Sequence, residues 1–529
     1  MVDKVDVLII GACPAGLTAA NCFNGGKSPR VRVIDKKSGT IQRGKADGLK
    51  SISLEVLDTL GIGDAIRSES HRVEEITLWE PDSQGGLIRY MTVPDRVPEL
   101  QKPREVTLDQ GRIEHHIVAA LHRHGNVEVS WKKRPIDLRV NIEAVEEPLA
   151  YPVTVVIRDV DDDIVPPEII QARYLIAYTV PKTDFPDIRK VCVIRSAQGT
   201  VMAIPREGKL VRLYVGMDGT GLDVAGGLDV RAFTVDHVID SARSIISPYM
   251  FEAGHVAWWS AYQVSQRVAE EFSRYDRVFL AGDAVRQGTN TGIQDAYNIG
   301  RELRFYLEQR CSPSLLSTYV HERRPIAQQL INFGREYLQI MATPNLDPDS
   351  FLSAFLLAMK FTTGIRIQYP RSLIVRPPSQ VGETTAVATG LSPGMRLPDF
   401  QIVNQADGIP TAVHHWFVMT GKFRLLIFAG SISKGHILRR LSAFGQWLAT
   451  DQDDWDYWRV YADDESYHDG CGEVYKRCGI DREDSRVVIV RPDGYISLIC
   501  ELERADQISL FSDNLGPVDS IAMARPARL

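Results

Sequence analysis

The chain opens with VDVLIIGACPAGLTAANCFNGGKSPRVRVID, residues 5–35, and this stretch decides the fold. Its first part, VDVLII, has the apolar run of a buried strand, and GACPAG leads from there into an alanine-rich helical segment. VRVID then returns as a second strand. The order strand, glycine turn, helix and strand is typical of the βαβ unit that opens a dinucleotide-binding domain.

The turn Gly11-Ala12-Cys13-Pro14-Ala15-Gly16 nearly matches the dinucleotide fingerprint. A pyrophosphate binds at the N-terminus of the helix that follows, where unpaired N–H groups and the helix dipole favour an anion. The middle position is normally glycine because the backbone must approach the pyrophosphate closely, and here it is Cys13. Asp35 ends the second strand, where an acid that binds ribose is expected. The alternative interpretation is a helix-capping turn that binds no ligand.

The patterns change several times along the rest of the chain. Apolar spacing in 112–121 predicts an amphipathic helix, and short alternating segments from about 125 to 270, such as VEVSW and LVRLYVG, predict an antiparallel sheet. RVFLAGDA, residues 277–284, predicts a buried strand running into a turn, with long helices from about 290 to 375. Residues 376–398 are rich in Pro, Gly and Ser and predict a linker.

Residues 399–529 predict a separate α/β unit whose clearest buried strand is FRLLIFAG. A thioredoxin-like fold fits this pattern. The strand is followed by Ser431-Ile432-Ser433-Lys434-Gly435, which lacks the exposed cysteine pair that thiol redox chemistry requires. We therefore expect this unit to pack against the rest of the chain or to dimerise.

Composition excludes several classes of protein. Of the 529 residues, 44% are hydrophobic and 24% charged, as in soluble globular proteins, and a net charge of -7 argues against binding nucleic acid. No apolar run has membrane-spanning length, and residues 1–10 predict a strand rather than a signal peptide. Seven cysteines favour a reducing, cytoplasmic setting; the spacing of Cys471 and Cys478 fits no metal site, so both are predicted to be structural. Ala527-Arg528-Leu529 resembles a peroxisomal address and leaves that location open.

A second set of segments extends over nearly the whole chain. In order, these are RGKADGLKSISLEVLDTLGI (43–62), TLDQGRIE (107–114), VPKTDFPDIR (180–189), AIPREGKLVRLYV (203–215), AGDA (281–284), QGTNTGIQDAYNIG (287–300), YVHERRPIA (319–327) and RPDGYISLI (491–499). This series resembles the FAD-dependent aromatic-ring monooxygenases of the fungal phenol hydroxylase family.

The resemblance implies an α/β fold in which a Rossmann-like FAD-binding domain carries an inserted antiparallel β-sheet substrate domain and is followed by a C-terminal thioredoxin-like domain. The implied boundaries are 1–124 and 271–375 for the discontinuous FAD-binding domain, 125–270 for the substrate domain, 376–398 for the linker and 399–529 for the thioredoxin-like domain, which is expected to mediate a homodimer.

The resemblance also implies roles for individual residues. Asp47 matches the active-site aspartate that assists phenol deprotonation, and Arg206 and Tyr214 match the pair that contacts substrate and flavin. The FAD-holding positions correspond to Gly11, Ala15, Gly16, Asp35, Lys36, Gln110, Asp283, Gly288 and Asn290. Flavin-dependent ring hydroxylation is electrophilic, so a carboxylate that ionises the phenol raises the electron density of the ring. From the residues alone, Asp47 and Arg206 are equally well a mutually paired or solvent-facing pair of charges.

Four departures from the family pattern qualify this interpretation. Cys13 stands in the phosphate loop, and Ile52 stands where an arginine is usual. ARYLI (172–176) runs through Ala177-Tyr178-Thr179 into VPKTDFPDIR without a Gly-Cys-Asp-Gly-type turn, and GDAVRQGTN (282–290) lacks a longer loop. The first hypothesis is an FAD- and NADPH-using monooxygenase that acts with O2 on a phenolic or polyketide-derived ring. The alternative is a non-redox homologue that binds an aromatic ligand with little or no FAD, or a sequence from which coding segments are missing.

Overall fold

The computed structural model describes most of the chain. The described residues are 3–25, 29–44, 46–95, 105–125, 127–147, 150–160, 174–216, 234–262, 267–286, 288–342, 347–364, 366–376, 388–417, 422–451, 459–463 and 472–516. Within these ranges no helix is long and apolar enough to span a membrane. Six cysteines lie in this part of the chain, and all are free thiols.

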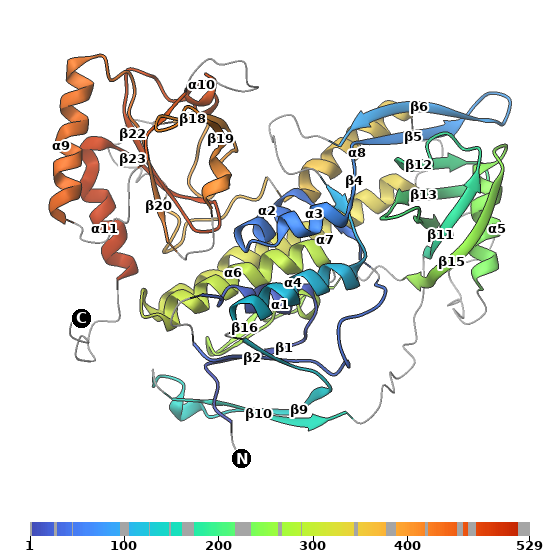
Figure 1. The fold of residues 1–529 in the computed structure, drawn as a ribbon, viewed down its shortest axis with the longest axis horizontal. Coiled ribbons are helices and arrows are strands. Elements are labelled where there is room, and N and C mark those ends of the chain that lie inside the picture. The colour runs from blue at the N-terminus through green and yellow to red at the C-terminus, as the bar shows by residue number, and fades with distance from the viewer. Residues whose placement is uncertain are drawn as a thin grey trace.

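The predicted βαβ unit is present. β1 (Val7–Ile10) leads through α1 (Pro14–Asn21) to β2 (Val31–Ile34), which pairs in parallel with β1 on one side and with β8 (Val127–Ser130) on the other. The helix expected at 112–121 is α4 (Gln110–His124). Figure 1 shows this small parallel sheet beneath α1, α4 and the long helix α6 (Thr289–Leu307). The segment VEVSW, expected in the antiparallel sheet, instead forms β8, because Val127 and Val129 pack into the core that α1 and α4 share with the parallel sheet.

α1 and α6 pack closely because small residues meet at the crossing. A Cβ atom on Gly300 of α6 would lie 3.0 Å from the Cys22 sulfur and 3.1 Å from the Cα of Ala19. A larger residue at this position would therefore force the two helices apart. The crossing fixes where the N-terminus of α6 meets the loop between β1 and α1.

The parallel sheet has an open edge at β1 within the described residues. Ile10, at the end of that strand, is 49% exposed. The buried strand predicted from RVFLAGDA is not formed, since β17 (Val278–Phe279) is only half-buried and pairs with β16 (Ser273–Arg274) in a short hairpin. Without a place in the parallel sheet the segment has no sheet to bury it, and Leu280 is 36% exposed.

A seven-stranded sheet forms the second layer of the molecule, in the order β15-β11-β14-β13-β12-β5-β6. Helix α5 (Val235–Ile246) covers one face, and its apolar side chains share a core with those of the sheet. The strands are β5 (Glu75–Pro81), β6 (Leu87–Pro94), β11 (Tyr174–Thr183), β12 (Val191–Ser196), β13 (Gly199–Pro205), β14 (Val211–Gly216) and β15 (Phe251–Tyr262). β5 and β6 precede residue 125, so the sheet draws on residues that the sequence analysis places in the FAD-binding domain; β5 joins it through parallel pairing with β12.

Strand β11 is a continuous strand of 10 residues. It pairs antiparallel with β14 on one side and with β15 on the other. The point where the sequence passes from ARYLI directly into Ala177-Tyr178-Thr179 therefore lies in the middle of this strand. As a result, the residues after Ile176 continue in the seven-stranded sheet.

Short elements connect these layers. β9 (Lys133–Val140) and β10 (Val153–Asp159) form a separate antiparallel ribbon. β3 (Gly48–Leu49), β7 (Val106–Thr107) and β4 (His71–Arg72) form a small sheet. In the sequence, α2 (Ser51–Thr59) and α3 (Gly63–Glu69) lie between β3 and β4. The long helices after α6 are α7 (Leu316–Ala342), which contains Pro325, and α8 (Pro348–Thr362).

The C-terminal unit is an α/β structure at the opposite end of the molecule from the seven-stranded sheet (Figure 1). Its main sheet has the order β20-β22-β23, and a second sheet has the order β19-β18-β21. Its elements are β18 (Gln401–Asn404), β19 (Pro410–Ala412), β20 (Arg424–Phe428), α9 (Gly435–Asp451), β21 (Tyr461–Ala462), α10 (Val474–Cys478), β22 (Arg486–Val490), β23 (Ile496–Glu501) and α11 (Ala505–Leu515). The clearest buried strand is β22 rather than the predicted FRLLIFAG, because β22 lies in the centre of the sheet and β20 at its edge.

Part of the predicted linker belongs to this unit. Residues 377–387 lie outside the described residues, but Leu391 and Leu397 are buried in the C-terminal core. Arg396 pairs with Glu55 of α2 and approaches His414 at 3.2 Å. Arg491 donates to both carboxylate oxygens of Glu322 in α7, at 2.5 and 2.9 Å. The second half of the segment is therefore a packed connection, held by the ion pair between Arg396 and Glu55.

Candidate functional site

The dinucleotide loop has the backbone that its glycines predict. Gly11 has φ of +110°, and an added Cβ there would meet nothing within 4 Å, so the space above it is open. Gly16 tolerates no side chain, since its Cβ would lie 1.9 Å from the carbonyl oxygen of Gly11. Two glycines thus allow the loop to turn tightly at the N-terminus of α1.

Asp35 organises the loop from the end of β2. Its Oδ2 accepts a hydrogen bond from the Ala12 N–H at 2.6 Å, and its Oδ1 accepts one from the Lys37 N–H at 2.8 Å. Lys36 is exposed, and Lys37 is the lysine that approaches the loop, with its Nζ 3.8 Å from Asp35 Oδ2 and 3.6 Å from Glu114 Oε2. The two carboxylate oxygens each retain acceptor capacity for a ribose hydroxyl.

Cys13 occupies the position where the fingerprint has a glycine. It is the N-cap residue of α1 and carries no side-chain capping bond. Burial raises the pKa of its thiol, while the backbone N–H groups of Gly16 and Ala15 act in the opposite direction. The thiol therefore lies neutral beside the N–H groups that would bind a pyrophosphate.

The segment after β17 meets this loop. Gly282 has φ of +63°, and a Cβ there would lie 3.0 Å from the Cβ of Ala15. Asp283 is exposed and accepts a hydrogen bond from the Gly288 N–H at 3.2 Å. Gly288 is the N-cap residue of α6. Two segments that are distant in sequence, both predicted to hold FAD, are therefore adjacent in the fold.

Asn290, in the first turn of α6, connects this region to the loop that carries Asp47. Its amide donates to the Gly48 carbonyl at 2.8 Å and accepts from the Lys50 N–H at 2.8 Å. Gln110 supports the other end of the same loop, since its Oε1 accepts from the Ala46 N–H at 3.3 Å. The predicted residues thus form one connected set, although in this structure Gln110 and Asn290 direct their polar groups to the protein backbone.

Asp47 lies between two buried arginines. Its Oδ2 is 3.1 Å from Arg206 Nη1, and its Oδ1 is 2.8 Å from Arg212 Nη1. Both arginines are 1% exposed and Asp47 is 6% exposed. Burial lowers the pKa of Arg206, but Asp47, Tyr178 and Glu207 together raise it by more, so the guanidinium stays charged. The pairing of Asp47 with Arg206 that the sequence left open is present, and it is buried rather than solvent-facing.

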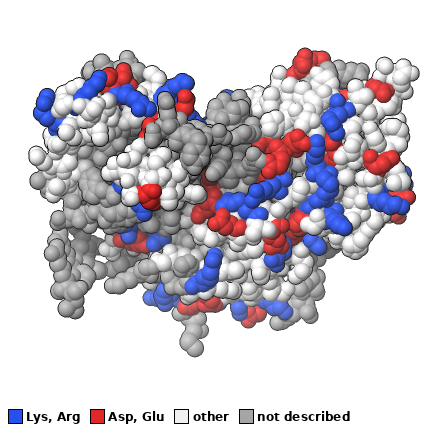
Figure 2. Space-filling model, turned by 45° about the horizontal axis from the view of Figure 1, so that its top comes forward, with Lys and Arg blue, Asp and Glu red and all other residues white. Residues whose placement is uncertain are grey.

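Further acids surround Arg206. Its Nη2 lies 3.1 Å from Glu207 Oε1 and 3.6 Å from Asp109 Oδ2. A second ion pair, between Lys50 and Glu105, lies next to this group, and burial raises the pKa of the neighbouring Asp95 to about 6. The region therefore combines several charges of both signs, and Figure 2 shows acidic and basic side chains interleaved on the outer surface as well.

Aromatic rings complete the site. The Arg212 guanidinium carbon lies 4.2 Å from the centroid of the Tyr214 ring and 5.3 Å from that of Tyr178. Tyr178 also packs on Trp258, with ring centroids 4.9 Å apart. Burial raises the pKa of Tyr178 to about 12, so its phenol is neutral at physiological pH.

Sequence reasoning missed Arg212, Tyr178 and Trp258. One signal was available, because alternation along β14 places Arg212 on the same face as Tyr214, two residues later. Tyr178 and Trp258 could not be found in this way, since their approach depends on the pairing of β11 with β14 and β15.

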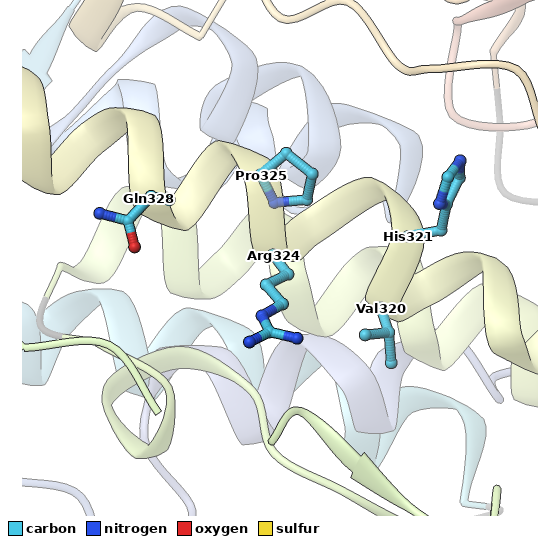
Figure 3. A pocket seen from close by; sticks show the side chains of 5 residues that line it. All are labelled: Val320, His321, Arg324, Pro325 and Gln328. Carbon is cyan, nitrogen blue, oxygen red and sulfur yellow. The ribbon is translucent and has the colours of Figure 1, made fainter. Parts of the chain in front are cut away.

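A cavity of about 420 Å³ lies elsewhere, along α7. Val320, His321, Arg324, Pro325 and Gln328 line it, and Figure 3 shows that all of them come from this one helix. None of the predicted site residues borders it. We therefore place the functional site at the Asp47 cluster and the adjoining dinucleotide loop.

The residues of the dinucleotide loop fit the adenosine diphosphate half of FAD. The open space over Gly11, the N-terminus of α1 and the buried acid Asp35 are the features that this half of a dinucleotide requires. Asp283 and Gly288 connect that half to the Asp47 cluster. The cluster itself can exchange a proton with a phenolic ligand and can bind its ring and its negative charge.

Family comparison agrees with this division of the chain. A model described as "FAD binding domain" matches residues 4–179 and 178–334, and one described as "Phenol hydroxylase, C-terminal dimerisation domain" matches 367–453 and 449–517. The chain is 44% identical over 582 positions to the "Phenol 2-monooxygenase fsqG" of Aspergillus fumigatus, covering 97% of this chain and 96% of the relative. It is 29% identical over 605 positions to the 3-hydroxybenzoate 4-monooxygenase of Comamonas testosteroni, covering 94% and 93%.

Solved structures share the fold. The flavin-dependent monooxygenase PieE, in complex with FAD and substrate, superposes with a TM-score of 0.70 at 17% identity, covering 97% of this chain and 99% of that one. Aklavinone-11 hydroxylase, in a ternary complex with FAD and aklavinone, gives a TM-score of 0.66 at 18% identity, with the same coverage.

The comparisons also locate what is shortened here. The 582 aligned positions exceed the 529 residues of this chain by 53, so at least that many residues of the Aspergillus relative have no counterpart. The two matches to the FAD-binding model meet at residues 178–179, within β11. The FAD-binding family model matches more than half of the chain, and one relative is 44% identical to it. Both findings agree with the fold predicted from the sequence. The chain belongs to the FAD-dependent aromatic monooxygenases of the phenol 2-monooxygenase type.

Proposed function

We propose that this chain is an FAD-dependent monooxygenase that uses NADPH and O2 to hydroxylate a phenolic or polyketide-derived aromatic ring. The observation that carries the proposal is the Asp47 carboxylate, which is buried between Arg206 and Arg212 and beside aromatic rings. Relatives named for phenol, for 3-hydroxybenzoate and for aklavinone support this class of substrate.

Asp47 is proposed to be the general base. Bound FAD supplies the oxygen-transfer chemistry, whose electrophilic attack on the ring requires an electron-rich phenol. Asp47 accepts the phenolic proton, which raises the electron density of the ring, and the two guanidinium groups offset the negative charge of the phenolate. Loss of a positioned base typically lowers a rate by about 10²–10⁴-fold.

Arg206 and Tyr214 are proposed to position the substrate and the flavin. Arg206 is fixed by Asp47, Glu207 and Asp109, so its guanidinium is held in one orientation. Tyr214 is half-buried and stacks on Arg212, which leaves part of its ring accessible. The proposed FAD ligands are the loop Gly11–Gly16, which includes Ala15, and the residues Asp35, Gln110, Asp283, Gly288 and Asn290. Lys36 is exposed, so we propose that it contacts FAD only at the protein surface.

The C-terminal unit is proposed to form a homodimer, because it matches a family model that is described as a dimerisation domain. Light scattering of the purified protein would test this. A mass of two chains is expected, and a mass of one chain at micromolar concentration would contradict it.

The first experiment is the flavin content of the purified protein, followed by NADPH oxidation and product analysis with a panel of phenols. Near-stoichiometric FAD and a hydroxylated product are expected. Protein that stays free of FAD in excess cofactor would instead favour the non-redox alternative.

Asp47→Asn, which preserves shape and removes the base, should keep FAD and lose turnover. The matched control is Asp240→Asn, whose side chain is 67% exposed on α5, far from the cluster. Equal turnover in the two variants would refute the role of Asp47.

A further inference from the structure

Tyr178 lies inside the site on the sheet face opposite to α5. In β11 it pairs with Arg212 of β14 and with Trp258 of β15, so the three side chains project from one face of the sheet. Its neighbour Ala177 points the other way, into the core under α5. Tyr178 is 1% exposed, so its ring is enclosed by the groups that form the site.

The contacts of this ring are those that a bound phenol would make. Its face lies over two guanidinium groups, with the Arg206 carbon 4.7 Å and the Arg212 carbon 5.3 Å from the ring centroid. The ring packs on Trp258 at an interplanar angle of 36°, and its hydroxyl donates to the Gly44 carbonyl at 2.7 Å. Small aromatic ligands are bound by this combination of an apolar enclosure and one or two fixed polar groups.

The position of Tyr178 in the chain is also informative. It stands where the two matches to the FAD-binding family model meet, in a chain that is at least 53 residues shorter than its aligned span. Tyr178 therefore takes its place in the site directly at the join. Its hydroxyl connects β11 to Gly44, 134 residues earlier, in the loop that carries Asp47.

We propose that Tyr178 fills a phenol subsite of this protein and is thereby a specificity-determining residue. Its side chain excludes a single-ring phenol from the space between Trp258 and the two arginines. Substrate then has access to Asp47 and Arg212 from the side of Tyr214, whose ring is only half-buried. This inference rests on the proposed function and adds that Tyr178 forms one wall of the substrate site. Its test measures ligand binding rather than turnover.

The test removes the Tyr178 ring by mutation and supplies p-cresol, a free ligand with the shape of the tyrosine side chain. Tyr178→Ala should bind one p-cresol per chain more than the wild type, measured by calorimetry on the FAD-loaded protein and, separately, on protein freed of FAD. Toluene has the same ring without the hydroxyl, so the lost hydrogen bond to Gly44 should weaken its binding roughly tenfold. Trp258 fluorescence should change with occupancy, and Trp258→Phe identifies that signal.

Two further variants act as controls. Tyr178→Phe keeps the ring in the subsite, so it should gain no p-cresol. Tyr90→Ala removes a tyrosine that is 36% exposed on β6 and should also gain none. If Tyr178→Ala does not fold alone, refolding in p-cresol should recover it and refolding in toluene should recover much less.

Several outcomes would overturn the proposal. These are equal p-cresol stoichiometry in Tyr178→Ala and the wild type, equal affinity for toluene and p-cresol, or no recovery of a misfolded variant by p-cresol. A wild type that hydroxylates no phenol would refute the proposed function and leave the extra p-cresol site intact. Normal turnover of a phenol by the wild type, with no extra p-cresol site in Tyr178→Ala, would support the proposed function and refute the Tyr178 subsite.

Discussion

Replacing Asp47 separates the chemical role of this carboxylate from its structural role. Arg206 and Arg212 are each 1% exposed and both contact Asp47 within 3.1 Å. Removing one partner of a buried ion pair costs about 3–5 kcal/mol, because the remaining charge has lost water and its counter-ion. Arg206 keeps Glu207 and Asp109 nearby, which limits the loss at this arginine. We expect Asp47→Asn to lower the free energy of unfolding by about 3 kcal/mol, the lower end of that range.

A second substitution distinguishes the two roles. In Asp47→Asn with Arg212→Met both charges of this buried pair are removed, so Arg212 is no longer a buried charge that has lost its partner. The double variant should therefore recover most of the lost stability in urea unfolding, while NADPH-coupled hydroxylation stays about 10²–10⁴-fold below the wild type. Recovery of turnover together with stability would show that Asp47 acts only through folding. A stable single variant would show that the arginines are not buried as described.

Three other predictions follow from the ion pairs and the phosphate loop. Cys13→Gly removes the side chain that lies beside the N–H groups at the start of α1, and one hydrogen bond gained by FAD should tighten its binding up to about tenfold, measured by fluorescence titration. Unchanged affinity would show that the thiol does not crowd the cofactor. Glu322→Gln leaves Arg491 with a weaker partner in a fully buried pair and should lower stability by about 3 kcal/mol in urea; a loss under 1 kcal/mol would contradict the burial. Burial and the nearby Arg396 hold the pKa of His414 well below its usual value. The contribution of the neutral imidazole to stability is therefore present above about pH 6.5 and lost as the pH falls. His414→Gln should reduce the fall in the free energy of unfolding between pH 7.5 and 5 by about 1–2 kcal/mol. Parallel plots of unfolding free energy against pH for the variant and the wild type would refute this.

Local patterns predicted the parts of the molecule that local physics determines. The loop around Gly11, the helix after it and the acid at Asp35 follow from strand, turn and helix preferences within 31 residues, and all are in place. The resemblance supplied Asp47 and Arg206, whose contact across 159 residues no periodicity could predict.

Elements whose state depends on distant neighbours were predicted less well. Val278 and Phe279 have the composition of a buried strand, but burial requires an adjacent strand, and β17 pairs only with β16 among the described strands. Leu391 and Leu397 lie in a Pro- and Gly-rich segment, yet they are buried by the C-terminal core. Tyr178 reaches the site only through its place in β11, which depends on two long-range strand pairings.

The ion pairs between the C-terminal unit and the rest of the chain restrict how this protein can be recombined. Glu55 and Glu322 come from the first part of the chain, and their partners Arg396 and Arg491 come from the C-terminal unit. A chimaera that exchanges the C-terminal unit with that of another protein must therefore carry both bases or replace both acids. The C-terminal unit and the first part of the chain therefore have to be exchanged together to keep both ion pairs.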